Sequence, residues 1–73
     1  MRITWDKSVD AAYIYLTDSN DGKSFGRMVT VDPEDIDGMI NLDFDSEGHL
    51  IGIEILSASS QLSPETLAQA ESR

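Results

Sequence analysis

The chain has 73 residues, of which 14 are acidic, five are Lys or Arg and none is cysteine, so its formal net charge is −9 at pH 7. A chain of this length forms at most one small domain, and without cysteine no disulfide can stabilise it. Because a surface of this sign repels phosphate, we expect no nucleic acid among its partners.

The lengths and flanks of the apolar segments indicate the cellular compartment of the protein. No basic region leads into an apolar stretch as a secretion signal requires, and no run is long enough to cross a bilayer. We therefore expect a cytoplasmic protein with no membrane partner. A core this small also favours self-association, so we expect a homo-oligomer, most simply a dimer.

The first third of the chain predicts a β-hairpin. Residues 3–5 form a short strand, residues 6–10 favour a turn, and residues 11–16 (Ala-Ala-Tyr-Ile-Tyr-Leu) are rich in strand formers. Apolar or aromatic side chains alternate onto both faces of the second strand. That strand should therefore lie inside the sheet.

A polar loop over residues 17–24 precedes the next predicted strand, residues 27–31. Pro33 ends that strand, because proline cannot donate to a ladder. An acidic loop follows.

A second hairpin is predicted from two alternating segments. Residues 39–45 place Ile40, Leu42 and Phe44 inward and their polar neighbours, Asn41, Asp43 and Asp45, outward. Residues 50–56 place three isoleucines on one face. The two segments are close enough in sequence to pair directly.

The C-terminal segment has the marks of a helix start. Ser63 would cap the N-terminus of this helix, Pro64 suits its first position and Leu62 can pack on Leu67. We therefore predict an α+β domain with an antiparallel sheet of four to five short strands within residues 1–62. Residues 63–73 would form a short C-terminal helix or a frayed tail.

Residues 43–54 imitate a twelve-residue calcium loop. Asp43, Asp45, Glu47 and Glu54 occupy ligand positions and Gly48 the sharp turn. Such a loop needs a helix on each side, whereas both flanks have the pattern of strands. We favour a hairpin with solvent-facing carboxylates, and a metal site made of those four residues is the alternative.

Two further groups are candidate interaction residues. Four crowded acids could be compensated by a basic protein partner, a cation or water alone. The aromatic residues could form an interaction patch, although core or subunit interface is the commoner role. The candidates are Trp5, Tyr13, Tyr15, Asp32, Glu34, Asp35 and Asp37.

Catalytic side chains are few. His49 is the single histidine, cysteine is absent and no serine stands between glycines in an elbow motif. We therefore expect neither an enzyme nor a bound cofactor.

Three blocks resemble the family of small bacterial proteins called Domain of Unknown Function 2283. They are residues 5–16, 38–45 and 48–59, and Gly-Ile-Glu-Ile-Leu at 52–56 is the most specific part. The resemblance covers residues 3–60 and implies a compact strand-rich fold, with no catalytic or binding residue to carry over. Members often lie beside small toxin-like genes, which by analogy suggests an antitoxin-like role.

The leading hypothesis is a small protein-protein interaction module, antitoxin-like in that it neutralises a basic partner. Ten acidic residues and no Lys or Arg lie between Arg27 and Arg73. The acidic rim would steer the encounter and an apolar strand face would make the contact. The alternatives are a divalent-cation-binding domain and a self-associating structural domain.

Overall fold

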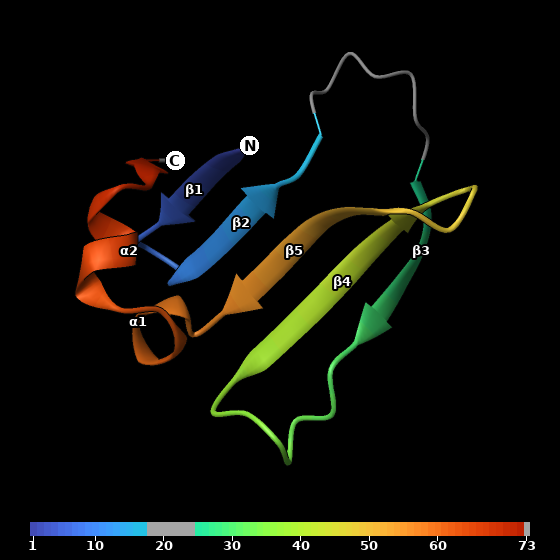
Figure 1. The fold of residues 1–73 in the computed structure, drawn as a ribbon. Coiled ribbons are helices and arrows are strands. Elements are labelled where there is room, and N and C mark those ends of the chain that lie inside the picture. Colours follow the sequence, from blue (N-terminus) through green and yellow to red (C-terminus); the bar gives the residue numbers. More distant parts are fainter. Residues whose placement is uncertain (18–24, 73) are drawn as a thin grey trace.

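The computed structural model describes residues 1–17 and 25–72 as an α+β fold (Figure 1). The described strands form one mostly antiparallel sheet in the order β3-β4-β5-β2-β1-β6, which confirms the predicted fold class. The elements in chain order are β1 (Arg2–Asp6), β2 (Ala11–Tyr15), β3 (Phe25–Thr30), β4 (Met39–Asp45), β5 (Leu50–Leu56), α1 (Ala58–Gln61), α2 (Pro64–Ala68) and β6 (Glu71–Ser72).

Both predicted hairpins are confirmed. β1 pairs antiparallel with β2, and β4 pairs antiparallel with β5. β2 lies between β1 and β5, so the strand that is apolar on both faces is an inner strand, as expected. The loop expected over residues 17–24 lies outside the described residues except for Thr17.

The predicted short C-terminal helix is confirmed as α2, and a further strand follows it. Ser63 caps α2 by accepting a hydrogen bond from the Thr66 N–H at 3.2 Å, with Pro64 in the first turn as predicted. The helix ends at Ala68, and β6 then pairs parallel with β1, which places Glu71 opposite Thr4. This return of the chain adds a sixth strand to the four or five expected. A helix this short leaves the following residues free to pair.

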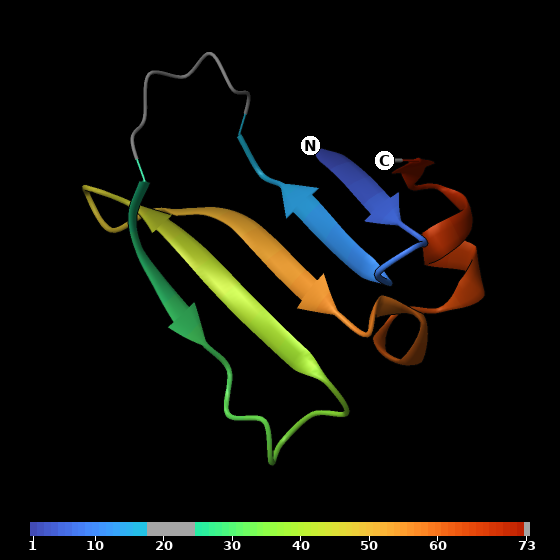
Figure 2. The same cartoon turned by 180° about the vertical axis from the view of Figure 1, so that it is seen from behind.

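The core is small and lies where the two helices meet the sheet. Ala12 and Ile55 from the sheet pack with Ala58 of α1 and Leu67 of α2, and half-buried apolar side chains surround them. Both helices lie beside β1, β2 and the end of β5, and neither lies over β3 or β4 (Figures 1 and 2). The helices therefore cover only part of the sheet.

Asp10 ties the turn of the first hairpin to α1. Its side chain accepts hydrogen bonds from Trp5 Nε1 at 3.0 Å and Ser59 Oγ at 2.7 Å, and its carbonyl accepts from the Ala58 N–H at 2.9 Å. The Ser59 N–H donates to the same carboxylate at 3.1 Å. Because Ser57 makes no side-chain cap, Asp10 supplies the acceptors for the first amides of α1. The bonds from Ser59 and Trp5 lower the pKa of Asp10.

The β4–β5 turn is organised by Asp45. Its carboxylate accepts hydrogen bonds from the N–H groups of Glu47 and His49, each at 2.9 Å, and Gly48 has a φ of 87°. These backbone donors, that of His49 first, lower the pKa of Asp45. Asp45 is only 3% exposed, so its expected outward position is wrong. The carboxylate turns into the loop to satisfy amides that would otherwise be unpaired.

None of the helices within residues 1–17 and 25–72 has the length and apolar character needed to span a membrane.

Leu67 is the main apolar anchor of α2, so truncating it tests whether the helix is part of the core. Leu67→Ala should lower the free energy of unfolding by about 2–4 kcal/mol, because it removes buried methyl groups and leaves a cavity. Urea denaturation followed by circular dichroism measures this. The matched control Leu50→Ala removes a side chain that is 36% exposed and should cost clearly less.

Lowered aspartate pKa values link folding to pH. The folded state holds the pKa of Asp10 and Asp45 below the unfolded value of about 3.9, so their stabilisation is present above that pH. It is lost as the pH falls through the folded pKa values. Asp10→Asn should therefore lower the melting temperature at pH 7 and flatten its fall between about pH 5 and pH 2.

The control Asp35→Asn corrects for the loss of one negative charge, because Asp35 lies exposed in the loop after β3. Equal pH slopes for the wild type and Asp10→Asn would contradict this role of Asp10.

Candidate interaction surface

A tyrosine–aspartate hydrogen bond crosses the sheet on the face opposite the helices. Tyr13 Oη of β2 donates to Asp43 Oδ2 of β4 at 2.5 Å, although β5 lies between the two strands. The ring passes over Gly52 of β5, where an added Cβ would collide with Tyr13 Oη. Glycine at this position therefore allows the ring to reach β4.

Burial and this hydrogen bond both favour the neutral form of Tyr13. Burial raises the pKa of Tyr13, and the hydrogen bond to Asp43 raises it further. Tyr13 therefore remains a neutral donor at neutral pH. It positions strands and is poorly suited to accept or release a proton there.

A second polar chain runs from the centre of the sheet to its edge. Asn41 Nδ2 donates to Glu54 Oε1 at 2.8 Å, and Thr30 Oγ1 donates to Asn41 Oδ1 at 2.8 Å. Asn41 lies on the face opposite Ile40, as the alternation predicted, but it is only 5% exposed, so it does not face solvent. Its amide is buried because it has a partner on each neighbouring strand. The chain of bonds couples β3 to β4 and β5.

The four candidate metal ligands lie in two different settings. Asp43 and Glu54 are hydrogen-bonded on the sheet, whereas Asp45 and Glu47 belong to the β4–β5 turn. Among residues 1–17 and 25–72, no three His, Asp or Glu side chains gather as a metal ion would require. The hairpin therefore does not bring these carboxylates together.

The aromatic candidates are divided between the two faces of the sheet. Tyr13 and Tyr15 lie with ring centroids 4.6 Å apart, and the Arg2 guanidinium lies 4.4 Å from the Tyr15 centroid. Trp5 pairs with Ala12 in register and packs on the core. The structure therefore brings two of the three aromatic residues together.

The four acidic candidates occupy the loop between β3 and β4. Asp32 accepts a hydrogen bond from the Glu34 N–H at 3.0 Å, and Ser60 Oγ donates to the Asp37 carbonyl at 3.1 Å. All four side chains are exposed: Asp32, Glu34, Asp35 and Asp37. The loop places a concentrated negative charge beside the end of β3.

Exposed apolar side chains on β3 were missed by the sequence analysis. Phe25 is 61% exposed, Met28 52% and Val29 39%, and we call these three residues the apolar edge. All six residues of β3 are exposed, and the strand is the outermost of the sheet. An alternating pattern predicted a strand here, but spacing alone does not say which strand lies at an edge.

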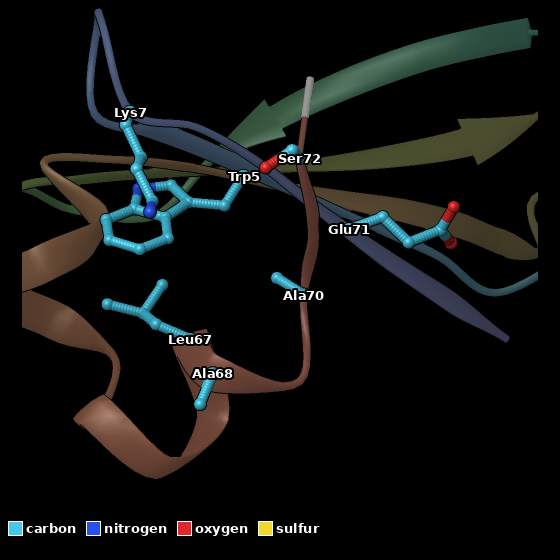
Figure 3. Close-up of a pocket in the computed structure, with 7 residues that line it drawn as sticks. All are labelled: Trp5, Lys7, Leu67, Ala68, Ala70, Glu71 and Ser72. Atoms are coloured by element: carbon cyan, nitrogen blue, oxygen red, sulfur yellow. The ribbon is translucent and has the colours of Figure 1, made fainter.

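Two hollows lie at opposite ends of the sheet. One of about 170 Å³ lies between β1, β6 and α2, where Lys7 Nζ is 5.3 Å from the Trp5 ring (Figure 3). Ligand pockets are commonly about 300–1,000 Å³, so this space suits only a very small molecule. The other, of about 440 Å³, lies at the start of β3 and is lined by Phe25, Arg27 and the β4–β5 turn.

Comparison with known proteins decides the family. The model described as "Protein of unknown function (DUF2283)" matches residues 2–59. The chain belongs to this family. The match spans β1 to the start of α1 and confirms the resemblance noted from the sequence. No curated protein and no solved structure matches the chain.

The DUF2283 segment contains the residues that link its two ends. Trp5, Asp10 and Ser59 all lie within the match, and their hydrogen bonds join the first hairpin to α1. The family description names no activity, so the surface itself must guide any functional proposal.

The tyrosine that crosses Gly52 supplies a double-mutant test. Gly52→Ala should lower the free energy of unfolding by about 1–3 kcal/mol, because the new methyl group displaces the Tyr13 ring and breaks its bond to Asp43. In a Tyr13→Ala background the same change should cost much less. Urea denaturation of all four proteins measures the coupling, and additive effects would contradict it.

Proposed function

We propose that this DUF2283 protein is a protein-protein interaction module that binds a basic partner. The observation that carries the proposal is the apolar edge, which exposes Phe25, Met28 and Val29 on the outermost strand. Phe25 and Met28 lie on one face of this strand and Val29 on the other, and exposed apolar side chains gathered along one strand commonly mark interaction sites. Neither helix lies over this part of the sheet in either view (Figures 1 and 2).

The charge distribution supports a basic partner. Ten acids and no Lys or Arg lie between Arg27 and Arg73, and four of those acids are exposed in the loop that follows β3. Complementary charge steers encounter and raises the association rate. An apolar centre beside a charged rim is the usual composition of an interface.

Binding and neutralising a basic protein, as an antitoxin does, is one form of this function. The acidic surface would then act on the partner's charge while the apolar edge contributes contact area. Cation binding is the weaker alternative, because the four candidate ligands are engaged in two separate settings.

Co-expression with the product of the adjacent gene tests the proposed function. The tagged wild-type protein should retain that product at low salt and lose it as salt screens the charges. The double variant Phe25→Ser, Met28→Ser should reduce retention at least tenfold, because it removes the apolar contact. Band intensity after affinity purification is the measurement.

Val9→Ser is the matched control, since Val9 is 67% exposed in the turn between β1 and β2, away from β3. Its variant should retain the partner like the wild type. If the double variant retains the partner as well as the wild type does, the apolar edge is not the binding surface. If the wild type itself retains no partner, the proposed function is contradicted.

A further inference from the structure

We infer that the partner binds by adding an extended strand to the outer side of β3. This inference rests on the proposed function and specifies how the partner is recognised. In strand addition, main-chain hydrogen bonds supply affinity and alternate side chains supply specificity. β3 is suited to it because no other strand among residues 1–17 and 25–72 pairs with its outer side, and because it is six residues long and exposed throughout.

The free backbone groups of β3 can be assigned from its pairing with β4. The Val31 N–H donates inward to the Ile40 carbonyl at 2.9 Å, and Val29 lies opposite Leu42 in the same register. Inward and outward bonding alternates along an antiparallel strand. Met28 and Thr30 therefore direct their N–H and C=O groups away from β4, toward an added strand.

Natural sheets protect their edges with short edge strands, charged side chains, proline or bulges. β3 has two of these devices at its start, Arg27 and the register shift between Phe25 and Arg27, whereas Met28, Val29 and Thr30 have none. The opposite edge, β6, has only two residues. β3 is therefore the edge that can receive a partner.

The side chains and charges around β3 indicate what that partner is. Phe25 and Met28 lie in register with Asp45 and Asp43, and Val29 lies on the other face, so an added strand meets apolar side chains on both faces. Exposed acids follow the strand in the loop over residues 32–37. The geometry therefore favours an extended segment that is apolar at its centre and basic at the end beside this loop.

A second copy of the chain fits this edge less well. Each copy has a formal net charge of −9, so two copies repel each other as they approach. Like charges opposed across an interface destabilise it. The charge pattern therefore favours a basic segment over self-pairing.

The test compares Met28→Pro with Met28→Ala, using as the probe a blocked peptide with a central run of valines flanked by lysines. Both variants remove the Met28 side chain, but only proline removes the outward N–H, and proline is tolerated on an edge strand. At low salt the wild type should bind the peptide, Met28→Ala should bind within about threefold, and Met28→Pro about tenfold more weakly or worse. Fluorescence anisotropy of a labelled peptide measures this.

Two further measurements use the unaltered protein, so the test does not depend on whether Met28→Pro folds. Binding should slow hydrogen exchange at the Met28 and Thr30 amides, which point outward in the free protein. The same peptide N-methylated along one edge should bind at least tenfold more weakly, because that edge can no longer donate.

The outcomes separate this inference from the proposed function. Retention of the co-expressed partner by Met28→Pro at the wild-type level would overturn strand addition and leave the interaction function standing. No peptide binding by the wild type, or binding without protection of Met28 and Thr30, would also overturn strand addition. A dimer in light scattering that Met28→Pro dissociates would show that the occupant is a second copy and overturn the basic partner.

Discussion

The arrangement of this domain depends on the carboxylate of Asp10. It accepts hydrogen bonds from Trp5 and Ser59, while the Asp10 carbonyl accepts from the Ala58 N–H. A core with four buried apolar residues offers little area to position two helices by packing alone. The hydrogen bonds of Asp10 orient α1 on the sheet, which packing in so small a core could not do alone. It fixes where α1 begins, and Ala58 is then fully buried against the sheet.

Fixing the helices at one end leaves the other end of the sheet uncovered. Neither helix lies over β4 or β3, so Phe25, Met28 and Val29 stay exposed on the outermost described strand (Figures 1 and 2). In a monomer such side chains cost solubility, and the acidic surface offsets this cost. The proposed partner would cover these side chains.

Local features of this fold could be predicted from the sequence, whereas distant contacts could not. The hairpins and the Ser63 cap depend on residues close in the chain, so alternation and capping chemistry identified them. The Asp10–Ser59 bond joins residues 49 apart, and nothing in the spacing indicates it. Strand order was equally hidden, so the edge position of β3 and the pairing of β6 were missed. The burial of Asn41 was not predicted because its two hydrogen-bond partners come from different strands.

The polar chain across the sheet connects these observations to binding. Thr30 at the edge is held by Asn41, which is held by Glu54 at the centre, and Tyr13 is bonded to Asp43 across β5. The Thr30–Asn41 bond holds the end of β3 on β4 before any partner arrives. The proposed strand addition would cost conformational entropy on both sides, but residues 27–30, which are already in register with β4, lose little more on binding. The entropic cost then falls mainly on the incoming segment, so a short extended peptide can bind without a large preformed pocket.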